Sequence, residues 1–187
     1  YWSQFQVEGW RDAGAPLALP NGVAKISFTG STVTGKKRLV YAGQSNMKRV
    51  SLECGGKSPQ IFLADLEDMD RAVTYAINGI FGVMGEVCSA GSRLLVDKRI
   101  AKAFTARFIE RGQHAYVAGD PLDPETNMGP LVTKKQHERV LAYIAKGREE
   151  GAKLEFGGDV PDRSGFYVNP ALFTNVDNRM TIAQEES

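Results

Sequence analysis

The chain has 187 residues, 42% of them hydrophobic, and carries 23 basic and 22 acidic side chains for a formal net charge of +1. This balance gives no electrostatic basis for binding nucleic acid or an anionic membrane. No apolar run approaches the ~20 residues of a transmembrane helix, and no signal peptide is visible. Two cysteines are too few for a disulfide framework and indicate a reducing compartment, so we expect a cytoplasmic protein.

Hydrophobic period and turn residues predict the elements along the chain. Residues 1–24 contain scattered glycine and proline without a clear period and are expected to be mostly irregular. In chain order there follow a strand at 25–29, a helix at about 32–44, strands at 49–54 and 60–64, a helix from Asp68 to Phe81, a strand at 92–98, a helix at 100–112 that ends at glycine, a surface loop at 118–130, a helix at 133–151, and strands within 152–158 and 165–173. This alternation predicts an α/β fold, a layered and largely parallel sheet flanked by helices.

The stretch KISFTGSTVTGKK (25–37) has the glycine and lysine spacing of a P-loop, from Gly30 to Lys36. A P-loop needs Ser or Thr after this lysine, because that hydroxyl binds magnesium, but Lys37 stands there. We therefore reject a nucleotide hydrolase. The free N–H groups at a helix start that is capped by Ser31 or Thr32 still suit a phosphate group, and a plain strand-to-helix turn is the alternative.

Cys88 lies in the stretch GEVCSAGS, where the residues that follow it are all small. Such neighbours provide little bulk to shield the sulfur, whereas structural cysteines more often lie among large apolar side chains. The sequence therefore indicates an accessible thiol, with a structural cysteine as the alternative.

Glu53 ends the strand at 49–54. The alternation of this strand places Cys54 on the apolar face with Val50 and Leu52, and Glu53 on the opposite face. A carboxylate at a strand end before two glycines can point into a cleft, and the alternative is a solvated edge charge. We expect Cys54 to fill the apolar face, and a reducing compartment disfavours a disulfide between Cys54 and Cys88.

The two histidines, His114 and His137, are isolated, and no cluster has the spacing of metal ligands. His137 lies on a charged helix face, where we expect exposure. Sequence leaves a Cys–His pair open, because such partners meet only in the fold.

Five stretches, FTGSTVTG, SLECGGKSP, GEVCSAGSRLLV, DPETNMGPLV and IAQEES, occur in this order. Together they resemble the NAD(P)-dependent aldehyde dehydrogenase superfamily, from about Ala13 to Ser187. The resemblance implies a fragment of a longer protein that spans the catalytic glutamate and cysteine motifs. Residues 1–55 would then be the C-terminal remnant of the dinucleotide-binding domain, and residues 56–187 an incomplete catalytic thiol domain.

The resemblance also implies the roles of individual residues. Cys88 would attack the aldehyde carbonyl to form a thiohemiacetal, hydride would pass to the nicotinamide of NAD or NADP, and a thioester would remain. Glu53 would be the general base that activates the thiol or the hydrolytic water. Gly30 and Ser31 would lie beside the diphosphate, and Glu186 would hold the nicotinamide ribose. No metal is implied.

Val83, Met84 and Glu86 depart from the family pattern, which usually has Asn, Gln and Gln at these positions. The change removes polar groups and adds an anion near the nucleophile, which disfavours its thiolate. Family members are considerably longer, so we expect weak or absent cofactor binding by this chain alone.

Two other functions remain open at this point. One is a cofactor-independent thiol esterase that uses Cys88 and Glu53, since acyl transfer needs only a nucleophile, a base and an oxyanion hole. The other is a non-catalytic remnant. The expected partner is a small aldehyde or ester, and uncovered sheet edges and apolar faces predict a homo-oligomer.

Overall fold

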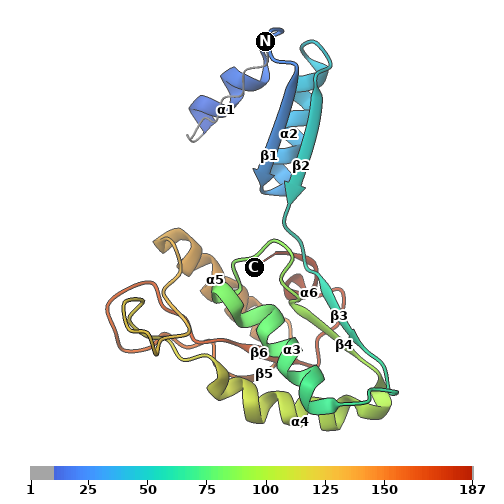
Figure 1. Cartoon of the computed structure of the whole chain (residues 1–187), viewed down its shortest axis with the longest axis vertical. Coiled ribbons are helices and arrows are strands. Elements are labelled where there is room, and N and C mark those ends of the chain that lie inside the picture. The colour runs from blue at the N-terminus through green and yellow to red at the C-terminus, as the bar shows by residue number, and fades with distance from the viewer. Residues whose placement is uncertain (1–10, 187) are drawn as a thin grey trace. The chain divides into compact units, whose positions relative to one another are not determined.

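The computed structural model describes residues 11–186 and comprises two compact units, which meet in sequence between Gly55 and Gly56 (Figure 1). Each unit is a small α/β assembly with its own strands and helices. The strands form three pairs among the described residues, and two of these pairs are parallel. The predicted α/β class is confirmed. Within residues 11–186, no helix is long and apolar enough to cross a membrane.

The N-terminal unit consists of one parallel strand pair and two helices. In chain order its elements are α1 (Arg11–Ala18), β1 (Lys25–Gly30), α2 (Thr32–Gly43) and β2 (Arg49–Cys54). The pairing of β1 with β2 runs from Lys25↔Arg49 to Gly30↔Cys54. The helix α2 packs closely on this pair, because a Cβ placed on Gly35 would lie 3.1 Å from Cys54 Sγ. The predicted strand at 49–54 has the bounds of β2.

The helix α1 corrects the expectation that residues 1–24 are mostly irregular; the part of that expectation on residues 1–10 lies outside the described residues. Side chains from distant sequence hold this helix. Arg38 Nη1 donates to Gly14 O at 2.7 Å, and the buried Lys48 Nζ donates to Ala18 O at 2.7 Å. Tertiary hydrogen bonds therefore stabilise a segment whose local pattern contains a proline and no clear period.

The C-terminal unit contains the other two strand pairs. Its elements in chain order are β3 (Pro59–Phe62), α3 (Met69–Phe81), the 3₁₀ turn η1 (Gly82–Gly85), β4 (Arg93–Val96), α4 (Lys98–Ala115), α5 (Lys134–Glu149), β5 (Lys153–Phe156), β6 (Leu172–Thr174) and α6 (Thr181–Gln184). The strands β3 and β4 are parallel and are joined by the crossover connection that parallel strands need, which contains α3; β5 and β6 are antiparallel. Of the strand predicted within 165–173, only its end enters β6.

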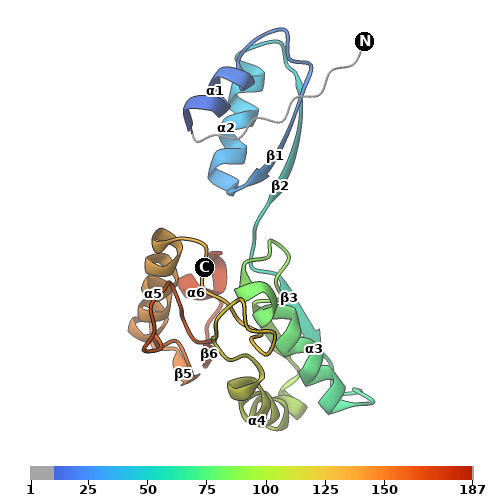
Figure 2. The ribbon, with the colours of Figure 1, turned by 60° about the vertical axis from the view of Figure 1, so that its left-hand side comes forward.

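The core of this unit lies between α3, α4 and the β3–β4 pair (Figure 2). Three phenylalanines, Phe62, Phe104 and Phe108, are at most 9% exposed, and the Phe62 and Phe104 rings lie 4.5 Å apart. The helix α3 begins at its capping residue Asp68, whose Oδ1 accepts from Arg71 N at 2.9 Å. It then carries the chain along β3 to the turn that contains Cys88.

The prediction that the helix beginning near residue 100 ends at Gly112 is wrong, because α4 continues to Ala115. Gly112 is buried, and a Cβ there would lie 3.2 Å from the rings of Phe108 and Phe156. The glycine therefore serves close packing against β5 rather than a helix stop.

Candidate active site

Cys88 lies on the turn between α3 and β4. Its thiol is free and the residue is exposed, as its small neighbours predicted. The Ala90 N–H donates to Val87 O at 2.9 Å, and the Gly91 N–H donates to Gly79 O at 2.9 Å. The chain therefore turns tightly around the cysteine and is tied back to α3 three residues later.

The backbone immediately before this turn is left-handed. Val83 has φ 51° and ψ 41°, Met84 has φ 56° and ψ 21°, and Gly85 has φ 73°. The left-handed region costs a residue with a Cβ roughly 1–2 kcal/mol, and a β-branched residue there is a strong outlier. The Glu86 N–H donates to Val83 O at 2.9 Å and helps to close this segment. The chain thus stores strain directly before the thiol, as functional turns often do.

Glu86 places a carboxyl group two residues before Cys88. Partial desolvation raises the pKa of Glu86, while a hydrogen bond from the Val132 backbone lowers it. The departure from the family pattern at this position is therefore an acid group whose pKa is raised by partial desolvation.

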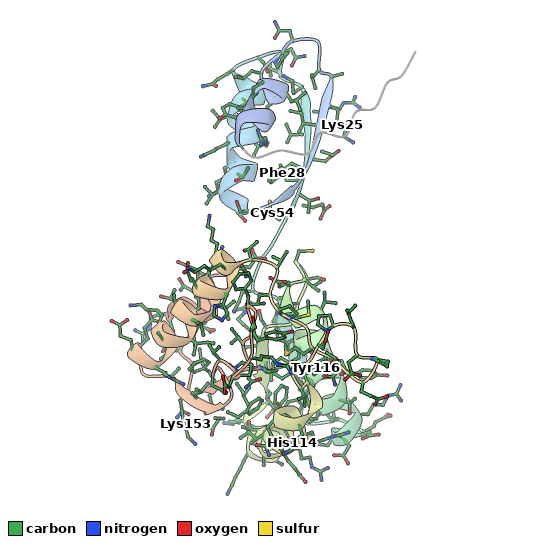
Figure 3. All side chains as sticks on the ribbon, turned by 90° about the vertical axis from the view of Figure 1, so that its left-hand side faces the viewer. Lys25, Phe28, Cys54, His114, Tyr116 and Lys153 are labelled. Atoms are coloured by element: carbon green, nitrogen blue, oxygen red, sulfur yellow. The ribbon has the colours of Figure 1, made fainter. Side chains whose placement is uncertain are left out.

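Glu53 lies on β2, in the N-terminal unit, where it pairs in register with Thr29. Glu53 is exposed, whereas its neighbours Leu52 and Cys54 are half-buried, so the predicted alternation of faces is confirmed. Phe28 and Cys54 lie on the side of the β1–β2 pair that α2 covers (Figure 3). Cys88 belongs to the C-terminal unit, so the two candidate catalytic groups come from different units of the chain.

Gly30 and Ser31 form the turn from β1 into α2. Ser31 is the cap of α2, with its Oγ accepting from Thr34 N at 3.3 Å. A Cβ on Gly30 would lie 2.7 Å from the Phe28 ring, so a side chain would not fit there. The first turn of this 12-residue helix has no acidic residue. These features fit an anionic group such as a diphosphate at the helix start.

Glu186 lies just beyond α6, beside α5. Its backbone oxygen accepts from Arg139 Nη2 at 2.5 Å, and the preceding Glu185 Oε2 accepts from Tyr143 OH at 2.7 Å. Burial lowers the pKa of Lys57, and the negative charge of Glu186 opposes that shift. The structure therefore brings Glu186 into the electrostatic field of the lysine that follows the Gly55–Gly56 pair.

The expectation that His137 is exposed is wrong. Its Nε2 lies 3.0 Å from Tyr167 O, and its ring centroid lies 6.2 Å from that of Phe166. The segment at 166–167 folds back onto the start of α5, which the helical pattern alone does not reveal. His114 is exposed near the end of α4. Within residues 11–186, no group of three or more His, Cys, Asp or Glu could hold a metal ion.

Sequence reasoning did not single out Gln60, whose side chain reaches from β3 to the Cys88 turn. The available signal was a polar residue in an apolar strand, two positions before the buried Phe62 and hence on the same face.

The family model described as Aldehyde dehydrogenase family matches residues 6–187. Retinal dehydrogenase 2 of Homo sapiens is 48% identical over 174 residues, which cover 93% of this chain and 33% of that protein. The cytosolic aldehyde dehydrogenase 1 of Rattus norvegicus is 47% identical, with coverages of 93% and 34%.

Solved structures give the same result. A crystal structure of indole-3-acetaldehyde dehydrogenase complexed with NAD+ matches with a TM-score of 0.89 and 48% identity, over 92% of this chain and 35% of that chain. The aldehyde dehydrogenase KauB from Pseudomonas aeruginosa matches with a TM-score of 0.88 and 48% identity, with coverages of 92% and 35%. The chain spans about one third of the length of these relatives. It belongs to the aldehyde dehydrogenase family.

Proposed function

We propose that this chain is the thiol-bearing part of an NAD(P)-dependent enzyme that oxidises an aldehyde to a carboxylic acid. The observation that carries the proposal is the exposed, free thiol of Cys88, on a tight turn within a chain that matches the family over residues 6–187. The names of the relatives, which include retinal and indole-3-acetaldehyde dehydrogenases, support an aldehyde as substrate.

In this mechanism the Cys88 sulfur bonds to the carbonyl carbon and forms a thiohemiacetal. The backbone N–H of Cys88 would stabilise the oxyanion that develops on the carbonyl oxygen. NAD(P)+, when bound, supplies the hydride acceptor. Glu53 then takes a proton from the water that attacks the remaining thioester, and the carboxylic acid leaves as the thiol is regenerated.

The cofactor residues follow from the same assignment. Residues 1–55 would be the remnant of the dinucleotide-binding domain, with Gly30 and Ser31 beside the diphosphate, and residues 56–187 would form the thiol domain. Glu186 would hold the nicotinamide ribose. The fit of an anion to the uncharged first turn of α2 supports the first of these roles. We also propose a cytoplasmic location.

Self-association is part of the proposal. Ile61 and Leu95 are register partners on β3 and β4, and both are exposed, as is Leu63 next to them. These three side chains form an uncovered apolar face, which favours association between copies.

The first test uses an activated ester without cofactor, because acyl transfer to Cys88 needs no dinucleotide. Ester turnover by the 187-residue chain should fall at least about a hundredfold in Cys88→Ala. In Glu53→Gln the acyl-enzyme should accumulate as a burst, since the water is no longer activated. The matched control is Cys54→Ser, which removes the other thiol and should keep the activity. Ester turnover that survives Cys88→Ala would overturn the role of this thiol.

The second test adds an aldehyde with NAD or NADP. NADH or NADPH formation would support dehydrogenase activity of this chain by itself. We expect weak cofactor binding by the 187-residue chain, and micromolar NAD affinity in calorimetry would contradict that expectation. Ester turnover without reduced cofactor would leave the chain as a thiol esterase. A folded chain that is silent in both assays would be a non-catalytic remnant.

A further inference from the structure

The amide of Gln60 connects three parts of the C-terminal unit. Its Nε2 donates to Gly91 O at 2.8 Å and to Ala76 O at 3.1 Å. A primary amide nitrogen has two N–H groups, so both donors are used. One side chain on β3 thereby holds the interior of α3 and the turn that carries Cys88.

Two glycines make room for this amide. A Cβ on Gly91 would lie 2.4 Å from Gln60 Cγ and 2.6 Å from Nε2, and a Cβ on Gly79 would lie 3.1 Å from Nε2. Neither glycine has a positive φ, so the space taken by Gln60, rather than the backbone conformation, requires glycine at these positions. The Gly91 N–H also donates to Gly79 O at 2.9 Å, which closes the contact between the turn and α3.

Gln60, Gly79 and Gly91 form a clamp on the Cys88 turn. Its member on the turn, Gly91, lies three residues after Cys88. The other backbone hydrogen bonds of the turn are local, from Ala90 N to Val87 O and from Ser92 N to Ala90 O. Two residues after Gly91, the Arg93 N–H donates to Ser58 O at 3.2 Å and Arg93 Nε donates to Lys57 O at 2.8 Å, so the far end of the turn is tied to the segment just before β3. The bonds to Gly91 are the nonlocal bonds that follow Cys88 most closely in sequence, and together with the Arg93 bonds they hold the turn against α3 and β3.

We propose that Gln60 is a positioning residue for the Cys88 thiol. The catalytic part of this proposal rests on the proposed function, whereas the clamp itself does not. Displacing a reacting group by about 1 Å can cost on the order of a hundredfold in rate. Loss of the amide should therefore lower the rate of chemistry more than it lowers substrate affinity.

The test compares Gln60→Met, which keeps the length of the side chain and removes both donors, with Phe104→Leu, a core change on α4 that removes none of the hydrogen bonds of the clamp. Amide hydrogen exchange of residues 88–92 is measured on both, at a temperature below the melting point of each. Gln60→Met should lower protection of the Gly91 amide about tenfold or more, beyond the change in global stability. Phe104→Leu should lower it only as far as global stability falls. Equal loss in both variants would overturn the clamp.

A second readout is ester turnover. In Gln60→Met, kcat should fall about tenfold or more with KM within about twofold, and Phe104→Leu should keep kcat while folded. Normal kcat in Gln60→Met would overturn the catalytic part. If the parent chain is silent in both the ester assay and the aldehyde assay, the proposed function fails, and hydrogen exchange alone decides the clamp.

The isosteric variant Gln60→Glu should make protection of the Gly91 amide depend on pH, which a change in side-chain packing alone would not do. A carboxylate faces two carbonyl acceptors and cannot donate, so protection of Gly91 should be lost at neutral pH. A protonated carboxyl has one O–H donor, so acidification should restore part of the protection relative to the intrinsic exchange rate. Protection independent of pH in this variant would contradict a role for the donor.

Discussion

Substitution of Gly91 by alanine should couple strongly to Gln60. The new methyl group would lie 2.4 Å from Gln60 Cγ and 2.7 Å from Cδ, well inside any allowed contact. Because Cγ is near the root of the side chain, Gln60 must leave its place and break its hydrogen bonds to Ala76 O and Gly91 O. The substitution therefore acts through the amide rather than through the backbone.

The magnitude follows from those two bonds. Each net hydrogen bond contributes about 0.5–1.5 kcal/mol, and a carbonyl left buried and unpaired costs about 1–3 kcal/mol. Replacing Gly by Ala at a compatible φ returns about 0.4–1 kcal/mol by restricting the unfolded chain. We expect Gly91→Ala to lower the free energy of unfolding by about 2 kcal/mol. In a Gln60→Ala background the methyl group finds space, so the same change should cost about 0 kcal/mol.

The assay is a double-mutant cycle of Gly91→Ala and Gln60→Ala in urea. Both tryptophans, Trp2 and Trp10, belong to the first 55 residues, so unfolding is followed by far-UV circular dichroism, to which the helices of both units contribute. The expected coupling energy is about 2 kcal/mol. Gly43→Ala is the control, since a Cβ there would have no neighbour within 4 Å. An equal cost of Gly91→Ala with and without the Gln60 side chain would refute the clamp geometry.

Other substitutions test separate features. Gly157→Ala should lower the free energy of unfolding in urea titrations by more than about 3 kcal/mol, because its φ is +68° and a Cβ would lie 1.6 Å from Pro170 O. Gly151→Ala should lower it by about 1 kcal/mol, because Gly151 has a φ of +93° but no neighbour within 4 Å of a Cβ. Equal losses in the two variants would contradict the clash at Gly157. Asp68→Ala should lower the melting temperature of the chain, because it removes the cap of α3, which contributes about 1 kcal/mol. Asp68→Asn should restore most of the lost stability, because asparagine also caps helices. Glu86→Gln tests the dependence of stability on pH. Desolvation raises the pKa of Glu86 in the folded state above its value in the unfolded state, so the folded state binds a proton more tightly. The parent chain therefore loses stability as the pH rises from the unfolded pKa through the folded pKa of this carboxyl group. Glu86→Gln should therefore be more stable than the parent chain at neutral pH and lose that advantage on acidification. An advantage that grows on acidification would contradict a raised pKa of Glu86.

Elements with strong local signals were predictable from sequence. The strand β2 shows strict alternation, and α3 begins at a capping aspartate, Asp68, followed by apolar residues at helical spacing. The helix α1 was not predictable, because its hydrogen bonds come from Arg38 and Lys48, which lie far along the chain. The end of α4 was not predictable for a related reason, because Gly112 packs against the ring of Phe156 on β5, which is distant in sequence.

In the candidate site too, features with local causes were predictable from sequence and features that depend on distant contacts were not. Exposure of Cys88 followed from its small neighbours, since bulk is a local property. The left-handed conformation of Val83 and Met84 opposes the preference of those residues, so no local rule indicates it. Such a conformation persists only where surrounding contacts over-determine it.

The two features that flank Cys88 depend on each other physically. A left-handed run at Val83 and Met84 costs roughly 1–2 kcal/mol for each residue and would relax if the turn could move. Gly91, tied to Gln60 and Gly79, prevents that movement from the other side. The thiol therefore sits between a strained segment and a fixed point. A fixed point made of two part-buried hydrogen bonds has about the energy needed to hold that strain, which gives the polar side chain of Gln60 a structural role in an otherwise apolar strand.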